Sequence, residues 1–137
     1  MLKVIDYDER QHVAYAEARA IPQATTDLGM RTFSLCAPSR RPLAVLDLGS
    51  GAGRFTPALA ETFGGPVYGV EPSAKMRDAA EVVRPANVRY LHGHAENVPL
   101  PDASCDLVLM FLSFHTCGIG LVPPARSPAC CVQADAC

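Results

Sequence analysis

Short apolar runs alternate with segments of helical periodicity from residue 42 onward. The apolar runs predict strands at residues 43–48, 67–70, 88–91 and 106–112. Between them, apolar side chains recur at helical spacing over residues 55–63 and 73–83. Gly64-Gly65 ends the first of these helices and Ser73 caps the second. Strands that alternate with helices predict an α/β domain with a mostly parallel sheet.

The amino-terminal residues 1–41 are expected to form a separate helical segment. Helices are predicted at about residues 8–20, ending before Pro22, and at 27–35, ending before Pro38. The amino terminus lacks the apolar block of a signal peptide, and no apolar run approaches the roughly 20 residues of a membrane-spanning helix. We therefore expect a cytoplasmic protein that does not contact a membrane.

Composition and charge narrow the possible partners. The chain of 137 residues is 49% hydrophobic and 19% charged, with a formal net charge of -2, which is typical of one globular domain and not of a nucleic-acid binder. The six cysteines include no Cys-x-x-Cys pair, and the four histidines have no zinc-ligand spacing. We expect neither a metal site nor a disulfide scaffold.

A glycine-rich loop, Asp-Leu-Gly-Ser-Gly-Ala-Gly at residues 47–53, follows the first predicted strand. In an open α/β sheet this is where a ligand lies, and glycines let the backbone approach it closely. A dinucleotide site would have G-x-G-x-x-G around a pyrophosphate, which Asp47 would repel. A cationic ligand would be attracted instead, and Glu71 at the next strand end can accept both hydroxyls of a ribose. An NAD-dependent oxidoreductase is thus the less favoured alternative.

Three ordered motifs resemble those of class I S-adenosylmethionine-dependent methyltransferases, most closely the methyltransferase type 11 group. Residues 45–53 resemble the first motif of this family, and residues 70–76 resemble the second. The third motif is matched by residues 93–100 together with residues 102–108. Two residues depart from the pattern, because His94 replaces an Asp that hydrogen-bonds the adenine amine and Cys105 replaces a Phe. A neutral His can still accept a hydrogen bond.

The resemblance implies a Rossmann-like, doubly wound, mostly parallel sheet with strand order 3-2-1-4-5-7-6, of which this chain supplies about four strands. It implies S-adenosyl-L-methionine as cofactor, with Glu71 on the ribose and Met76 near the adenine. The cofactor-binding residues it implies are Asp47, Gly49, Ser50, Gly51, Gly53, Glu71, Pro72, Met76, His94, Ala95 and Glu96. Simpler interpretations are an Asp47–Arg54 ion pair, and a solvated pair at Arg40 and Arg41.

The tail at residues 116–137 does not continue the family pattern. It is rich in Pro, Ala and Cys, and contains four of the six cysteines. A shifted reading frame would permit Arg-Val-Leu-Arg-Pro-Gly-Gly-Arg-Val over residues 128–137 and His-Leu-Arg-Asp-Arg over 115–119, as the family continues. We hypothesise a frameshift near His115 and a tail that is frameshifted or disordered, and codons incompatible with that frame would refute the frameshift.

The predicted domain organisation is a helical segment at 1–41, a cofactor-binding half at 42–115 and the atypical tail. The predicted function is S-adenosylmethionine-dependent methyl transfer to a small-molecule acceptor, an in-line displacement for which no catalytic residue is identified. The alternative is an inactive fragment that only binds cofactor or a partner. The strand at 106–112 is expected to lack a neighbour, and so to promote self-association and low stability.

Overall fold

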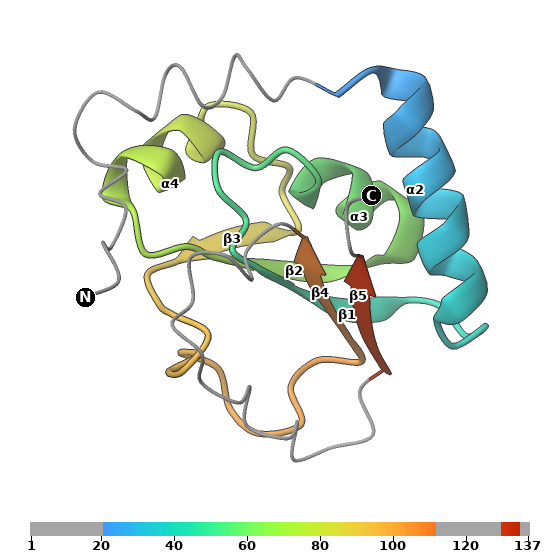
Figure 1. The fold of residues 1–137 in the computed structure, drawn as a ribbon. Helices are drawn as coiled ribbons and strands as arrows, with labels where there is room; N and C mark the ends of the chain where they lie inside the picture. Colours follow the sequence, from blue (N-terminus) through green and yellow to red (C-terminus); the bar gives the residue numbers. More distant parts are fainter. Residues whose placement is uncertain (1–20, 112–129, 135–137) are drawn as a thin grey trace, which may run out of the picture.

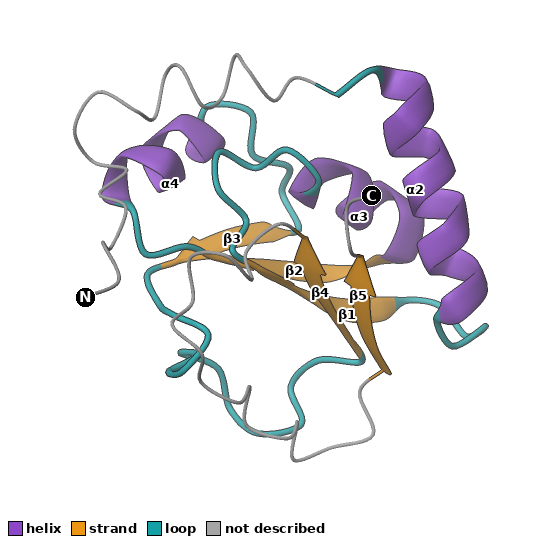
Figure 2. Ribbon diagram, viewed as in Figure 1, coloured by secondary structure: helices purple, strands orange, loops and turns teal. Residues whose placement is uncertain are grey.

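The computed structural model describes residues 21–111 and 130–134, which form a parallel sheet with three helices on one side of it (Figures 1 and 2). The helices are α2 (Gln23–Cys36), α3 (Thr56–Phe63) and α4 (Ala74–Glu81). The strands are β1 (Leu43–Leu48), β2 (Gly64–Val70), β3 (Val88–Leu91), β4 (Leu107–Phe111) and β5 (Cys130–Ala134).

The strands are all parallel and lie in the order β3-β2-β1-β4-β5. This confirms the predicted open parallel sheet and agrees with the first five positions of the expected strand order. β1 is central, and its burial on both faces explains why residues 43–48 form a nearly continuous apolar run. In register, Leu48 lies beside Val70 and Met110, so the carboxyl ends of three strands meet at one edge of the sheet.

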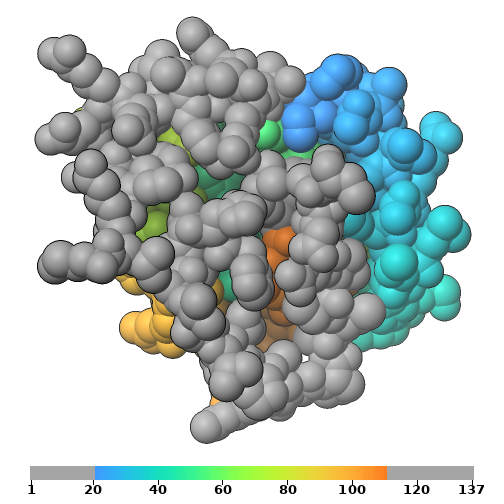
Figure 3. All heavy atoms as spheres, viewed as in Figure 1, coloured from blue at the N-terminus to red at the C-terminus, as the bar shows by residue number. Residues whose placement is uncertain are grey.

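One face of the sheet packs against α2 and α3. Met30 and Phe33 of α2, together with Leu59 and Phe63 of α3, join the inward residues of β1, β2 and β4 in one buried cluster. In the space-filling view α2 forms one flank of the molecule (Figure 3). Its outer side carries polar residues such as Arg31, which is exposed. This amphipathic division is why the segment folds as a helix against the sheet.

The opposite face carries a loop in place of a described helix. The segment 92–106 runs beneath the sheet in Figure 2, on the side away from the helices. Ala95, Val98 and Leu100 from this loop pack with Leu48 and Val70. Pro99 and Pro101 have no backbone N–H to donate, so they disfavour a helix in this loop. The apolar residues of the loop nevertheless cover the sheet. The described helices therefore cover one face only of the sheet that was expected to be doubly wound.

Several predicted boundaries differ from the observed ones. The helix expected at 27–35 begins earlier, at Gln23, and the strand expected at 67–70 begins at Gly64. Both differences reflect weak local signals that packing overrides. The helix expected at 8–20 lies outside the described residues. None of the helices within the described ranges is long and apolar enough to cross a bilayer.

The expectation that the 106–112 strand lacks a neighbour is wrong. β5 lies beside β4 in parallel register, with Leu107 opposite Cys130 and Leu109 opposite Val132. The described sheet therefore has five strands, and residues 130–134 of the tail belong to it. The apolar sequence Cys-Cys-Val supplies residues that strands accept, and pairing satisfies the backbone groups along one edge of β4.

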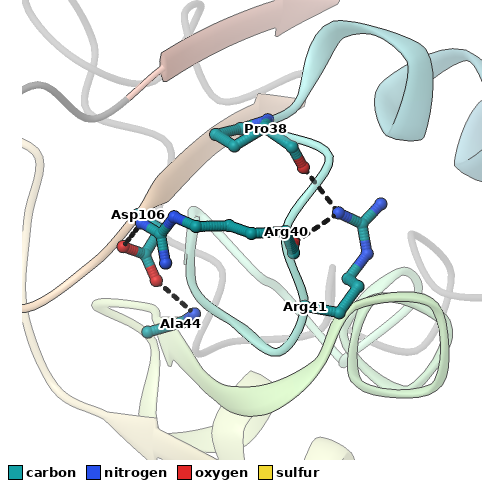
Figure 4. A network of polar contacts seen from close by, with 5 residues as sticks. All are labelled: Pro38, Arg40, Arg41, Ala44 and Asp106. Carbon is teal, nitrogen blue, oxygen red and sulfur yellow. Dashed lines mark hydrogen bonds and ion pairs between the residues drawn. The ribbon is translucent and has the colours of Figure 1, made fainter.

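Arg40 and Arg41 are exposed, as the solvated pair expected there would be, but both side chains also bind other groups (Figure 4). Arg40 forms an ion pair with Asp106 at 2.5 Å, and Asp106 also accepts a hydrogen bond of 2.8 Å from the Ala44 amide. Arg41 donates to Pro38 O at 2.6 Å, and its guanidinium stacks over the ring of Phe63. The segment before β1 is thereby fastened to the starts of β1 and β4.

Candidate functional site at the carboxyl ends of the strands

The glycine loop turns back over the end of β2. The amide of Gly49 donates to Val70 O at 2.8 Å, and that of Ser50 donates to the same oxygen at 3.3 Å. These bonds fold residues 49–53 against the next strand end, where Glu71 begins the following loop. The first two predicted motifs are therefore brought together at one edge of the sheet.

Three loop positions have backbone conformations that favour glycine. Gly49, Gly51 and Gly53 have φ angles of 75°, 58° and 78°, which place all three in the left-handed region. A Cβ at Gly53 would also collide with the hydroxyl of Tyr90 and would lie 3.1 Å from Ala80 Cβ. A Cβ at Gly51 would lie 3.6 Å from Met76 Cε, so this glycine and the predicted adenine-contacting residue are neighbours.

Glu71 ties the two site loops together through its carboxylate. Its Oε2 accepts a hydrogen bond of 2.9 Å from the Gly51 amide, and its Oε1 accepts one of 3.0 Å from the Ser73 amide. The residue is buried, with 7% of its surface exposed. A carboxylate has about four acceptor positions. These two bonds orient the group and leave it capacity to accept from the hydroxyls of a ligand.

Asp47 is a buried carboxylate at the end of β1. Its Oδ2 accepts a hydrogen bond of 2.7 Å from the hydroxyl of Thr56 in the first turn of α3. Burial raises the pKa of Asp47 to about 6, the Thr56 hydrogen bond opposes that effect, and the nearby charge of Glu71 adds to it. A cation bound beside these two carboxylates would stabilise their ionised forms.

The start of α4 supports the second motif as the sequence predicts. The hydroxyl of Ser73 accepts a hydrogen bond of 3.3 Å from the Met76 amide, which caps the helix. Arg77 donates to the carbonyls of Glu71 and Pro72 at 2.6 and 2.9 Å, and so fixes the loop that carries the carboxylate. Met76 is buried and Pro72 is exposed.

The third predicted motif forms a tight turn beside the same strand ends. The amide of Asn97 donates to His94 O at 3.0 Å, and Ala95 is buried with Leu48 and Val70. His94 and Glu96 are exposed, and the His94 ring meets His92 edge-on at a centroid distance of 5.7 Å. The structure thus places Ala95 at the site edge and leaves the two polar side chains accessible to a ligand.

Asp106, which also belongs to the third motif, lies at the opposite end of the sheet. It precedes β4 and binds the Ala44 amide at the start of β1, whereas the glycine loop follows the end of β1. The Ala44 amide and the Arg40 guanidinium together hold the pKa of Asp106 below its usual range. Within this structure Asp106 joins strands and does not line the site.

Thr56 and Tyr90 are site residues that sequence reasoning missed. Thr56 holds Asp47, and its position three residues after Gly53 is the only local sign of that role. Tyr90 on β3 is the register partner of Gly69 on β2 and reaches the last glycine of the loop. The pairing of a large aromatic residue with a glycine one strand away could have indicated this contact.

The chain matches the family described as "Methyltransferase domain" over residues 46–129. The match covers more than half of the chain and contains the whole glycine loop, Glu71 and the His94–Asn97 turn. The chain belongs to this methyltransferase family.

Relatives of this methyltransferase domain include longer proteins from several bacteria. An uncharacterized methyltransferase of Mycobacterium tuberculosis is 41% identical over 93 residues, which are 68% of this chain and 34% of that protein. A demethylmenaquinone methyltransferase of Geobacillus is 39% identical over 82 residues, which are 56% of this chain and 32% of that protein. The chain thus spans about a third of the length of these curated relatives.

The fold is also found among solved methyltransferase structures. The crystal structure of a SAM-dependent methyltransferase from Aquifex aeolicus aligns with a TM-score of 0.56 and 28% identity, covering 62% of this chain and 48% of that one. An S-adenosylmethionine-dependent methyltransferase from Mesorhizobium loti aligns with a TM-score of 0.50 and 28% identity, covering 59% of this chain and 37% of that one. The parallel sheet is therefore that of a Rossmann-like methyltransferase.

Proposed function

We propose that this methyltransferase domain binds S-adenosylmethionine at the glycine loop, and that the protein transfers its methyl group to a small-molecule acceptor. The observation that carries the proposal is the Glu71 carboxylate, which is buried and oriented by the amides of both site loops. The similarity to the SAM-dependent methyltransferases of Aquifex and Mesorhizobium supports the cofactor, and the similarity to the demethylmenaquinone methyltransferase of Geobacillus supports a small acceptor.

The residues present suit this cofactor chemically. Three glycines in left-handed conformations carry no Cβ, so a ligand can approach the backbone of this loop closely. Glu71 retains acceptor capacity for the two hydroxyls of a ribose, and the carboxylates of Asp47 and Glu71 favour a ligand with positive charge. The same two carboxylates would repel the pyrophosphate of a dinucleotide, which argues against an NAD-dependent reaction.

The proposed roles of the residues concern binding and orientation. Glu71 would hold the ribose, and Met76 beside Gly51 would contact the adenine. Asp47 would face the cationic amino-acid moiety, and the His94–Asn97 turn would border the adenine. When bound, S-adenosylmethionine supplies an electrophilic methyl carbon on a sulfonium, and the surrounding residues align it while excluding water. We assign no residue to acid or base catalysis.

Isothermal titration with S-adenosylhomocysteine, and with NAD in parallel, tests the proposal. We expect micromolar binding of S-adenosylhomocysteine and none of NAD. Glu71→Gln should weaken binding about tenfold or more, because a hydrogen bond to a charged group contributes about 1.5–3 kcal/mol. Glu61→Gln, at an exposed position of α3, is the matched control and should bind as the wild type does. Binding of NAD alone, or of neither ligand, would refute the proposed function.

A further inference from the structure

The side chain of Tyr90 fills a space shared by two glycines. A Cβ at Gly69 would lie 2.5 Å from Tyr90 Cδ1 and 2.7 Å from Cε1, so the ring covers the backbone of β2 at that position. At its other end the ring reaches the glycine loop, where a Cβ at Gly53 would lie 3.2 Å from Cζ and would collide with Oη. Tyr90 thus links β3, β2 and the last glycine of the loop.

The hydroxyl of Tyr90 is buried and has no hydrogen bond of ordinary length with any described residue. Leaving a buried hydroxyl without a partner costs about 1–3 kcal/mol. Burial raises the pKa of Tyr90. The hydroxyl of Thr56 lowers this pKa, which indicates that the two side chains interact. Thr56 is therefore the polar side chain with which the Tyr90 hydroxyl can pair.

The direction of such a hydrogen bond is fixed by Asp47. Thr56 has one hydroxyl hydrogen and uses it to donate to Asp47 Oδ2 at 2.7 Å. An ionised carboxylate can only accept, so the lone pairs of Thr56 Oγ1 are left to accept from another donor. Tyr90 can be that donor. The chain of hydrogen bonds therefore runs from Tyr90 through Thr56 to Asp47, and it forms in this direction when Asp47 is charged.

We propose that Tyr90 is a positioning residue of the cofactor site, whose hydroxyl acts through Thr56 to hold Asp47 in its charged form toward a cationic ligand. This rests on the proposed function, because S-adenosylmethionine carries an ammonium and a sulfonium that an ionised Asp47 would attract. Hydrogen bonds in a chain polarise one another, so donation by Tyr90 strengthens the bond that Thr56 makes to the carboxylate.

The other charged groups near this chain of hydrogen bonds lie after β2 and at the end of α4. Glu71, after β2, faces Asp47 and favours its protonated form. Glu81, the last residue of α4, faces Tyr90, as does Arg84 beyond it. These two pair with one another at 2.6 Å, and Arg84 also donates to Val88 O at 2.8 Å. The charges of Asp47 and Glu81 raise the pKa of Tyr90, and that of Arg84 lowers it.

The test is the titration of Asp47 in variants that remove one hydroxyl at a time. The carboxyl carbon of Asp47 is followed by NMR between about pH 4 and about pH 8, and the affinity for S-adenosylmethionine is measured by calorimetry over the same range. Tyr90→Phe keeps the ring and removes the donor. We expect it to raise the titration midpoint of Asp47 by about 0.5–1 pH unit, with the midpoint for binding shifted equally.

Thr56→Val should raise the Asp47 midpoint further, and Tyr90→Phe should then have no additional effect in the double variant. Tyr68→Phe, on β2 and packed with the cluster on the other face of the sheet, is the control and should leave the midpoint unchanged. An unchanged Asp47 midpoint in Tyr90→Phe, or additive shifts in the double variant, would overturn the inference. The NMR titration needs no ligand, so a wild-type chain that fails to bind S-adenosylmethionine would refute the proposed function without deciding the role of Tyr90.

Discussion

Asp47 combines complete burial with a pKa of about 6, so its ionisation is coupled to folding. The folded chain holds this proton more tightly than the unfolded chain, where the pKa is near 3.8. The free energy of unfolding should therefore fall as the pH rises from about 4 to above 6. Asp47→Asn removes this dependence while keeping an oxygen that can accept from Thr56. At about pH 8 it should stabilise the fold by up to about 3 kcal/mol.

Urea unfolding of the wild type and Asp47→Asn at about pH 4 and about pH 8 measures this effect. The gain should appear at the higher pH only. Asp78→Asn, at an exposed position of α4, is the control and should bring no comparable gain at either pH. A gain of equal size at both pH values would mean that the ionisation of Asp47 is not the cause.

Ala103 has a φ angle of 60°, the left-handed conformation that L-residues with a Cβ rarely adopt. This conformation destabilises the folded state by about 1–2 kcal/mol when the residue is alanine, and glycine avoids that strain. Glycine in turn costs about 0.5–1 kcal/mol, because it loses more conformational entropy on folding. Ala103→Gly should therefore stabilise the domain by about 0.5–1 kcal/mol in urea unfolding. Ala79→Gly, inside α4, should instead destabilise it by a similar amount. If both variants are destabilised alike, the strain at Ala103 is absent in solution.

At the scale of the elements, Asp106 joins the starts of β1 and β4. Its carboxylate accepts from a backbone amide at 2.8 Å and pairs with Arg40, whose side chain is 63% exposed. Asp106→Ala should cost about 1–2 kcal/mol because the Ala44 amide loses a charged acceptor. Arg40→Ala should cost less than about 0.5 kcal/mol, since an exposed ion pair contributes little. Urea unfolding at neutral pH measures the loss of stability in each variant. Equal losses in Asp106→Ala and Arg40→Ala would contradict the larger contribution expected of the Ala44 amide.

The pH dependence of this contribution has the opposite sign to that of Asp47. The pKa of Asp106 is lowered in the folded state, first by the Ala44 amide and then by Arg40. The stabilisation is therefore present above the unfolded pKa of about 3.8, and is lost as the pH falls through the lower folded value. In Asp106→Ala this acid-induced loss should be absent.

The elements that the sequence predicts well are those with strong local signals. Residues 43–48 and 88–91 are short apolar runs bounded by turns, and their observed limits equal the predicted ones. Ser73 was identifiable as a cap because its side chain acts on an amide only three residues away. β5 was missed because its apolar residues lie in a segment without periodicity, and only the free edge of β4 gives them a place in the sheet.

The same distinction between local and distant signals applies to the site. Glycine spacing and the acid at a strand end indicate Asp47, Gly51 and Glu71, and the structure brings the two motifs together through the Gly51–Glu71 bond. The contribution of Tyr90 depends on contacts with residues 21 and 37 positions earlier in the chain, which no local pattern encodes. Arg40 could not be distinguished from a solvated cation until its partner Asp106, 66 residues away, was placed beside it.

At the scale of the whole molecule, the described sheet has edge strands β3 and β5, so the edge that was expected at 106–112 lies at β5. β4 is paired on both sides, whereas β5 is the last strand in the order. Unpaired backbone groups along an edge strand can pair with another chain. We propose that a second copy of this chain binds along β5, in place of the edge expected at 106–112.

Sedimentation velocity under reducing conditions, over a series of protein concentrations, tests this association. The average mass of the wild type should rise with concentration. Val132→Lys should suppress the rise, because a charged side chain on an edge strand disfavours pairing with another strand. Val82→Lys changes an exposed valine beyond α4, 82% of whose surface is accessible, and should leave association intact. A wild type that stays monomeric would contradict this association. Equal suppression by Val82→Lys would show that the copies do not associate through the edge of β5.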